Sequence, residues 1–386
     1  MPNSSTPPSS TPPSSTPAAP NAHRRKSKFS RRGMIGAAGA VAAGAALTPV
    51  VFAATDSAAQ DSGSSTSGTT TESFPETRSA AATGTDAVSG SFPIGYVGVR
   101  WSGAEAGAAI RVQQADGTAG EWQSLSSGCA TLGSGGTALV PVGSVSGYEL
   151  KAPGTVESLA IDTKHGPKRE AKVPADATRV RGVAYLSRAA WGADESKRFK
   201  ADGTENSPTK YYPAQTITVH HTDTQNDDPD PAATVRAIYE YHAVTLDWGD
   251  IGYHFLIDEA GRVYEGRYSG DDGIPAHDKD GNVVTAFHVG GYNSGNLGIA
   301  LLGTLVDQGP THAAQASLTA LIRVLDRYHG FDPQAKVTYT NPVNAVTKDV
   351  TTVSGHRDWL QTDCPGSTMY ALLDAVRADA ATSGKS

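Results

Sequence analysis

The feature that most restricts the fold of this chain lies near its C-terminus, where a histidine and a cysteine stand eight residues apart. Residues 355–366 read GHRDWLQTDCPG and contain His356 and Cys364. We expect no disulfide at Cys364, because the other cysteine, Cys129, falls in what we expect to be a different domain. Imidazole and thiolate are both good ligands for zinc and similar metals. The stretch therefore predicts a metal site, which needs at least one further ligand from elsewhere in the chain.

The best further donor ends a β-branched run that predicts a buried strand. Residues 216–222 read TITVHHT, so His220 and His221 close the strand. Successive side chains of a strand point to opposite faces, and only one of the two can share a site with His356 and Cys364. Three protein ligands and one open position are typical of a catalytic metal site rather than a structural one. The fold must then bring the end of this strand against the C-terminal stretch.

Other catalytic patterns fit less well. The sequence contains neither the His-Glu-x-x-His of helix-borne zinc proteases nor the Gly-x-Ser-x-Gly of serine hydrolases. A cysteine nucleophile formed by Cys364 with His356 is an alternative, although a thiolate beside two imidazoles is better placed to bind a metal. Cys129 has no basic residue near it in the sequence to activate its thiol, which favours a buried or incidental role.

The first 54 residues predict an export signal. A Ser/Thr/Pro-rich start is followed by a basic segment with the pair Arg31-Arg32, an apolar run to about Leu47, and small residues at Ala53 and Ala54. This arrangement resembles a twin-arginine signal peptide, so we expect a secreted, extracellular protein, with cell-wall association left open. A membrane anchor is the alternative, but the run is shorter than the ~20 apolar residues of a span. No other segment is apolar enough to predict a span in the mature chain.

The charge pattern argues against nucleic acid as a partner. Six of the 32 Lys and Arg residues lie in the first 54 residues, which hold none of the 39 Asp and Glu residues. The rest of the chain is therefore clearly acidic, whereas phosphate binding needs a basic face. Because no segment has the heptad pattern of a coiled coil, we expect a monomer.

Composition divides the remaining chain into four parts. Residues 55–91 are rich in Ser, Thr, Gly and Ala and predict a disordered linker. In residues 92–165 short apolar runs alternate with turn signals, which predicts an all-β domain resembling a β-sandwich. Residues 166–182 are charged and contain proline, so we expect a second linker. The proposed metal ligands then belong to a C-terminal domain at residues 183–386.

The C-terminal domain mixes the periodicities of strands and helices. Strands are predicted for residues 216–219, 253–257, 262–265 and 297–302, the last as a buried central strand. Helices are predicted for residues 231–246 with Asp230 as N-cap, for residues 318–328 ended by Gly330, and for residues 369–376. Strands and helices mixed in this way predict an α/β fold with a mixed central β-sheet flanked by helices.

Six motifs in the C-terminal half occur in the order typical of one protein family. They are residues 186–193 (LSRAAWGA), 219–222 (VHHT), 250–257 (DIGYHFLI), 264–267 (YEGR), 288–299 and 355–366. Through these motifs residues 185–380, about half of the chain, resemble the peptidoglycan recognition proteins and the related type 2 zinc N-acetylmuramoyl-L-alanine amidases. The strand-rich segment upstream is similar to one that precedes such amidases in actinobacteria.

The resemblance implies a role for five residues. His220, the first histidine of the pair, matches a zinc ligand, and His356 and Cys364 match the other two, so Zn²⁺ is the implied cofactor. Tyr253 matches the catalytic tyrosine, which we expect to hydrogen-bond the attacking water or the developing oxyanion. Thr362 stands where some relatives carry lysine and others threonine; its hydroxyl can donate to an oxyanion but adds no positive charge.

Four further residues match positions that line the muropeptide groove of the family: His242, Trp248, His288 and Asn293. An aromatic face with neutral hydrogen-bonding groups suits a sugar and a peptide. His242 could instead belong to a helix core and Trp248 could serve packing only, whereas the glycines near His288 and Asn293 indicate an exposed loop. The Gly-Trp pair that relatives use for diaminopimelate stems reads Asp247-Trp248 here, so the stem specificity stays undefined.

The implied function is that of a secreted zinc amidase that cleaves the bond between N-acetylmuramic acid and L-alanine in peptidoglycan. A peptidoglycan-binding protein without catalysis is the alternative, and a zinc peptidase that acts within the stem peptide is a third. In the family, loss of the cysteine ligand separates binders from enzymes, and the presence of Cys364 favours the enzyme.

Overall fold

The structure, a computed structural model, describes residues 68–104, 106–114, 116–127, 135–175, 178–271 and 274–382. The expected signal peptide, the first part of the expected linker and Cys129 lie outside these residues. Within the described part of the chain, no helix combines the length and the apolar character that crossing a membrane requires.

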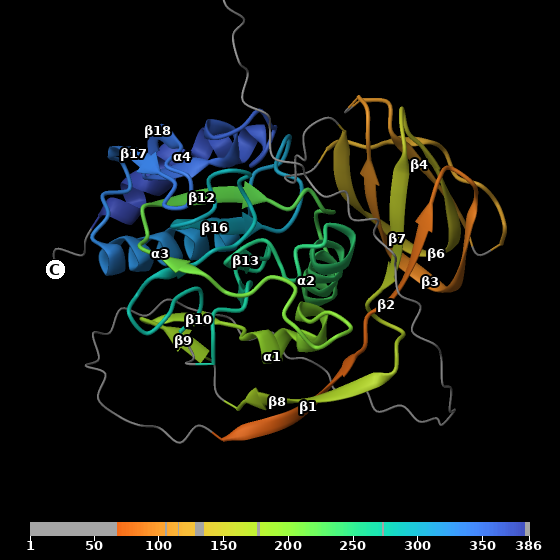
Figure 1. The fold of residues 1–386 in the computed structure, drawn as a ribbon, viewed down its shortest axis with the longest axis horizontal. Helices are drawn as coiled ribbons and strands as arrows, with labels where there is room; N and C mark the ends of the chain where they lie inside the picture. The colour runs from red at the N-terminus through yellow and green to blue at the C-terminus, as the bar shows by residue number, and fades with distance from the viewer. Residues whose placement is uncertain are drawn as a thin grey trace, which may run out of the picture. The chain divides into compact units, whose positions relative to one another are not determined.

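A five-stranded sheet forms the centre of the C-terminal half (Figure 1). In sheet order its strands are β14 (Val263–Glu265), β13 (Phe255–Ile257), β16 (Asn296–Leu301), β12 (Thr216–His221) and β19 (Val353–Gly355). β12 pairs in parallel with β16 and with β19, and β13 pairs in parallel with β16. Only β14 runs antiparallel to its neighbour, so the sheet is mixed, as predicted.

The alternation of side chains along these strands divides the apolar core in two. One face of the sheet packs against α3 (His312–His329) and α4 (Ser367–Ala381). The opposite face packs against α1 (Arg188–Trp191) and α2 (Pro231–Glu240). In β16, for example, Ile299 belongs to the first core and Ala300 to the second. The predicted α/β fold, a mixed sheet flanked by helices, is confirmed.

Helix α2 begins where the sequence predicts. The Asp230 side chain accepts a hydrogen bond from a backbone N–H of the first turn at 3.1 Å, and Pro231 is the first helical residue. The predicted helix reaches residue 246, but α2 ends at Glu240 and continues as a π-helical turn, η2 (Tyr241–Thr245). Such turns are rare and frequently mark functional sites, and this one carries His242.

Shorter elements connect these parts. They are β9 (Thr178–Val180), β10 (Val183–Tyr185), β11 (Tyr211–Tyr212), β15 (Val283–Val284), β17 (Lys336–Thr340), β18 (Thr347–Thr351) and the 3₁₀ helices η1 (Glu195–Arg198) and η3 (His356–Asp358).

A six-stranded antiparallel sheet precedes the C-terminal half. In sheet order its strands are β2 (Arg78–Thr83), β7 (Val156–Asp162), β3 (Val88–Trp101), β6 (Gly136–Lys151), β4 (Ala109–Gln113) and β5 (Gln123–Ser124). Register shifts between β3 and β6 bend these two long strands, and β3, β4, β6 and β7 share one apolar core. The described strands follow the expected all-β pattern but belong to a single sheet, so a two-sheet sandwich is not confirmed.

The expected linker at residues 55–91 is wrong for its described part. β1 (Thr69–Pro75) pairs with β8 (Lys168–Pro174), and β2 forms an edge of the six-stranded sheet (Figure 1). β8 and β9 also fall within the expected second linker, residues 166–182. The residues of β1 and β8 are mostly polar and exposed, so composition indicates no core there. Pairing with a strand distant in the chain, which composition does not reveal, holds them in place.

The six-stranded sheet makes close contacts with α2 and η2, and all described residues belong to one compact unit. The Tyr96 hydroxyl lies 2.7 Å from Thr234 Oγ1, and the Tyr241 hydroxyl donates to the Val99 carbonyl at 3.3 Å. At Gly98 in β3, an added Cβ would lie only 2.5 Å from Cδ2 of Tyr241. The backbone of β3 therefore approaches the Tyr241 ring as closely as a glycine allows.

Candidate active site

Three buried donors meet at the end of the central sheet. His220 is the last residue but one of β12, His356 begins η3, and Cys364 precedes α4. Their ligand atoms all lie within 4.8 Å of one another, with Cys364 Sγ 3.5 Å from His220 Nδ1. The ring centroids of His220 and His356 are 4.6 Å apart. The fold thus brings together the three residues that the sequence predicts as metal ligands.

His356 shows why this cluster suits a metal. Its side chain is fully buried, yet neither Nδ1 nor Nε2 has a hydrogen-bond partner among the described residues. A buried polar atom without a partner costs about 1–3 kcal/mol, so such atoms usually mark a group that the protein alone does not satisfy. Two imidazoles and one thiolate form a donor set that zinc prefers. The residues therefore fit a bound metal ion of that kind.

A chain of hydrogen bonds fixes which nitrogen of His220 faces the other donors. His288 Nε2 lies 2.9 Å from the Asn296 carbonyl, so this nitrogen carries the proton. His288 Nδ1 must then accept, and it lies 3.0 Å from His220 Nε2, which donates. The free lone pair of His220 is therefore on Nδ1, beside Cys364 Sγ. A second residue that orients a ligand histidine in this way is typical of metal sites.

Burial keeps these imidazoles neutral and available as ligands. Desolvation, followed by the neighbouring histidines, lowers the pKa of His356 to about 3 and the pKa of His220 well below its usual value. Desolvation also lowers the pKa of His288 to about 4. None of the three rings therefore carries a positive charge near pH 7.

The neighbouring His221 confirms that the two adjacent histidines point to opposite faces. Its Nδ1 accepts a hydrogen bond from the Leu305 N–H at 3.1 Å, and only His220 of the pair belongs to the donor cluster. The turn that carries His356 is held by Asp358, whose carboxylate accepts from the Gly355 N–H at 2.8 Å and from the Tyr370 hydroxyl. Asp358 therefore supports the site through the backbone of this turn.

Tyr253 lies next to the metal ligands. Its ring centroid is 5.3 Å from that of His220, and the side chain is buried. Thr362 lies two residues before Cys364, and its hydroxyl oxygen accepts from the Cys364 N–H at 3.3 Å. That hydroxyl keeps its own proton to donate. The roles predicted for Tyr253 and Thr362 stay predictions.

His254, the neighbour of Tyr253, is excluded as a proton-transfer group. Its Nε2 donates to the Val284 carbonyl at 2.7 Å, and its Nδ1 accepts from the Gly298 N–H at 2.8 Å. Both nitrogens are therefore bonded to backbone groups, and the ring is fully buried.

A buried ion pair, which the sequence analysis misses, positions the segment that leads to Tyr253. Arg188 Nη1 donates to Asp250 Oδ1 at 3.0 Å, and both side chains are almost fully buried. Asp250 Oδ1 also accepts from the Ile251 N–H, and Asp250 Oδ2 from the Tyr268 N–H. The only signal in the sequence is the position of Arg188 and Asp250 inside two of the family motifs, which says nothing of their pairing.

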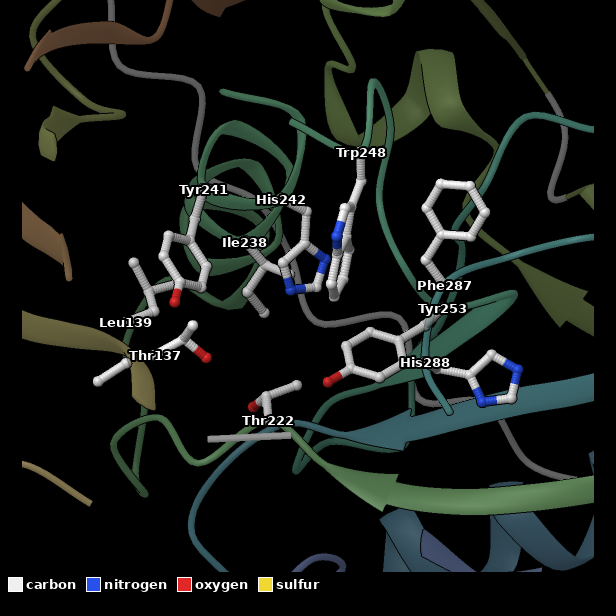
Figure 2. Close-up of a pocket in the computed structure, with 11 residues that line it drawn as sticks. Thr137, Leu139, Thr222, Ile238, Tyr241, His242, Trp248, Tyr253, Phe287 and His288 are labelled. Carbon is white, nitrogen blue, oxygen red and sulfur yellow. The ribbon is translucent and has the colours of Figure 1, made fainter. Parts of the chain in front are cut away.

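A cleft, shown in Figure 2, lies beside His220, because its lining residues Tyr253 and His288 contact that ligand. Tyr253, His288 and Thr222 line its end near His220, and Trp248 and Phe287 line one side. The ring of His242 lies between those of Trp248 and Tyr253, at centroid distances of 4.8 Å and 5.5 Å. The structure thus places His242 and Trp248 in this cleft, and their contact with a muropeptide stays a prediction.

The chemistry of His242 is that of a neutral hydrogen-bond donor. Its Nδ1 accepts from the Gly252 N–H at 2.9 Å, which leaves the proton on Nε2. Desolvation, with a smaller effect of Arg267, lowers the pKa of His242 to about 3. Among the described residues that line the cleft there is no Asp, Glu, Lys or Arg.

The loop with His288 and Asn293 differs from expectation. Gly290 and Gly291 are exposed, as predicted, but His288 is only 4% exposed because it packs behind His220. Asn293 does not line the cleft, and its side-chain oxygen accepts from the N–H groups of His288 and Val289 at 2.9 and 2.7 Å. These contacts indicate that both residues support the metal ligands, and direct contact with substrate stays a prediction.

The cleft also has lining residues that sequence reasoning misses. Thr222, Ile238 and Phe287 come from the C-terminal half, and Thr137, Ala138 and Leu139 come from β6 of the preceding sheet (Figure 2). No local signal marks these residues, because their position depends on how α2 packs against the six-stranded sheet.

Comparison with known proteins agrees with this site. Residues 210–367 match the sequence model of a family described as N-acetylmuramoyl-L-alanine amidase. A peptidoglycan recognition protein of Trichoplusia ni is 30% identical over 161 residues, which cover 41% of this chain and 72% of that protein. Human N-acetylmuramoyl-L-alanine amidase is 30% identical over 142 residues, which cover 37% of this chain and 20% of that protein. The chain therefore matches about a fifth of the length of the human relative.

Among solved structures, Drosophila PGRP-LB is similar to this chain. It has 24% sequence identity and a TM-score of 0.36, over 50% of this chain and 92% of that one. The match of the family model across the metal ligands and the similarity to the Trichoplusia ni protein decide the assignment. The chain belongs to the family of peptidoglycan recognition proteins and type 2 N-acetylmuramoyl-L-alanine amidases.

Proposed function

We propose that this protein is a zinc-dependent N-acetylmuramoyl-L-alanine amidase that hydrolyses the amide between N-acetylmuramic acid and L-alanine in peptidoglycan. One observation carries the proposal: the fully buried His356 has two unpartnered nitrogens next to Cys364 and His220. A protein that only bound cell wall would have no use for this cluster. The amidase relatives support the choice of the amide bond.

In the proposed reaction His220 Nδ1, Cys364 Sγ and one nitrogen of His356 would hold the metal. Zinc in such a site lowers the pKa of bound water towards ~7 and polarises a carbonyl group. The His288 relay fixes the tautomer of His220 and leaves no proton on the nitrogen that faces the metal. The lowered pKa values of His220 and His356 keep both rings neutral near pH 7.

The remaining steps fall to uncharged groups. The Tyr253 hydroxyl points into the cleft (Figure 2) and donates to the oxyanion that develops on the scissile carbonyl. The Thr362 hydroxyl, held by the Cys364 N–H, supplies a second donor next to the ligands. No described residue that lines the cleft is an Asp or Glu, so the proposal assigns no carboxylate base, and the proton lost by the attacking water would pass to the leaving amine.

We further propose that the protein acts outside the cell. The twin-arginine pattern in residues 1–54 supports export, and a monomer that binds muropeptide is the working state. Whether the chain stays attached to the wall is decided by fractionating culture medium and cell wall.

Product analysis by mass spectrometry tests the proposal. The full mature chain is incubated with purified peptidoglycan, with zinc and with a chelator, alongside C364A and H356A. Two matched controls remove a residue of the same type elsewhere: C129A, and H312A at the exposed start of α3. We expect stem peptides with a free L-alanine amino terminus only for zinc-loaded wild type and the two controls.

Other products would select another function. Release of peptides that leave L-alanine on the sugar would indicate a peptidase that acts within the stem. Intact peptidoglycan in every sample, with protein sedimenting alongside it, would show a binding protein without catalysis and refute the amidase.

A further inference from the structure

One wall of the cleft comes from outside the domain that carries the metal ligands. Thr137 and Leu139 of β6 lie across the cleft from Tyr253 and Trp248 (Figure 2), and Ala138 between them also belongs to the lining. These three residues, which we call the β6 wall, lie about 80 residues before His220 in the chain. The six-stranded sheet is thus in contact with the space where a substrate would bind.

The alternation of side chains along β6 shows that Leu139 is directed at this space. Ala138 and Val140 pack against the apolar core of the six-stranded sheet itself. Leu139, between them, packs instead against the two clusters that contain Ile238 and Tyr241 of the α2 region. Because neighbouring side chains in a strand point to opposite faces, Leu139 faces α2 and the cleft.

The sheet also holds the helical turn that carries His242. The side chain of Thr137 is hydrogen-bonded to the Tyr241 hydroxyl, which also donates to the Val99 carbonyl at 3.3 Å. Gly98 leaves just enough room for the Tyr241 ring. The β6 wall and the cleft residue His242 are therefore fixed relative to one another through a single residue, Tyr241.

The cleft between the β6 wall and His242 has the chemistry of a site for an uncharged group. Its lining combines apolar side chains such as Leu139 and Ile238 with hydroxyl groups and the neutral imidazole of His242. Such a surface suits a group that has methyl and amide or hydroxyl functions. In a muropeptide this description fits the N-acetylated sugar on one side of the scissile amide and the alanine backbone on the other.

We propose that the six-stranded sheet is a specificity-determining part of the amidase site, in which Leu139 of the β6 wall sets the size of the uncharged group accepted beside the scissile amide. The inference rests on the proposed function for the identity of the substrate. In this inference the strand-rich segment forms part of the substrate site and is not a separate attached module.

The test compares the full chain with three variants. L139A enlarges the cleft, L139F narrows it, and V142A is the matched control, because Val142 lies on the same strand but packs against the sheet's own core. The kcat/KM is measured for two pairs of muropeptides with the same scissile amide. One pair differs by an added N-acetylglucosamine on the sugar, and the other by a dipeptide or a tetrapeptide stem.

We expect L139A to shift the ratio of kcat/KM between the larger and the smaller substrate of one pair by about tenfold in favour of the larger. That value corresponds to the discrimination produced by a small change in pocket size. L139F should shift the same ratio in the opposite direction, and V142A should shift it less than about twofold. The substrate pair whose ratio of kcat/KM changes shows whether the sugar or the peptide lies against the β6 wall.

A binding measurement separates this inference from the amidase proposal. Isothermal titration calorimetry on metal-free protein gives the Kd of N-acetylmuramic acid and of the L-alanyl-D-isoglutamine dipeptide for each variant. Kd values that change in L139A and L139F but not in V142A would support a role of the β6 wall in binding, even if no variant cleaved peptidoglycan. Equal ratios and equal Kd values in all four proteins, with active wild type, would overturn the inference and leave the amidase intact.

Discussion

A buried carboxyl group in α3 predicts an unusual dependence of stability on pH. Asp326 is only 4% exposed, and neither of its carboxylate oxygens has a hydrogen-bond partner among the described residues. Desolvation, with a smaller effect of the nearby Asp332, raises the pKa of Asp326 from 3.8 to about 7. The folded protein therefore favours the protonated carboxyl group.

The sign and size of the effect follow from this shift. Because the pKa in the folded state lies above that of the unfolded chain, ionisation of Asp326 opposes folding. The loss of stability begins above pH 3.8 and is complete above about pH 7. A pKa raised by about three units corresponds to ~4 kcal/mol, and relaxation of the protein around the buried charge reduces this to about 2–3 kcal/mol.

The substitution D326N isolates the effect. Asparagine resembles the protonated acid, so the variant should gain about 2–3 kcal/mol over wild type at about pH 8.5 and almost nothing at about pH 4. Urea unfolding at both pH values measures the difference in unfolding free energy between D326N and wild type. The cost of burying the asparagine amide is the same at both pH values, so it cancels when the two differences are compared. D379N, at an exposed position of α4, serves as the control. A gain that is the same at both pH values, or larger in acid, would refute the reasoning.

Three further predictions concern the site and its support. H288A should weaken metal binding about 10–100-fold, because His220 loses the partner that fixes its tautomer. Competition with a chromogenic chelator measures the metal affinity, and an unchanged affinity would contradict this role of His288. Y253F should lower kcat about 10²–10³-fold with metal content unchanged, and wild-type turnover would exclude an oxyanion role. G98A should destabilise the protein by about 1–3 kcal/mol in thermal unfolding, since the new methyl group meets the Tyr241 ring. G95A, whose Cβ meets no atom closer than 3.6 Å, should not.

Much of the C-terminal half could be predicted from the sequence, because its signals are local. The β-branched run at β12 and the capping pair Asp230-Pro231 each have a meaning that does not depend on distant residues. The metal ligands His220, His356 and Cys364 could be grouped because histidine and cysteine are rare in this sequence and have few roles in common. Because one metal ion must contact all three side chains, their donor chemistry predicts that the fold brings them together.

The roles that the sequence did not reveal depend on contacts between distant segments. His288 looked like a residue of an exposed loop, but β16 places it behind His220. The residues of β1 looked like a linker because their composition is polar, but β8 supplies the hydrogen bonds that hold them. His288 and the polar residues of β1 are compatible both with an exposed segment and with a packed one. Their residue types alone therefore do not predict which environment they occupy.

The sequence by itself thus determined the donor set and the α/β pattern, since both follow from residue type and short-range periodicity. Only the tertiary structure decided that Nδ1 of His220 faces the other donors, that Asp250 is tied to Arg188, and that β6 forms a wall of the cleft. The physical reason is the same for all three. A hydrogen-bond direction, an ion pair or a shared cleft needs two groups in contact, and packing of segments far apart in the chain creates that contact.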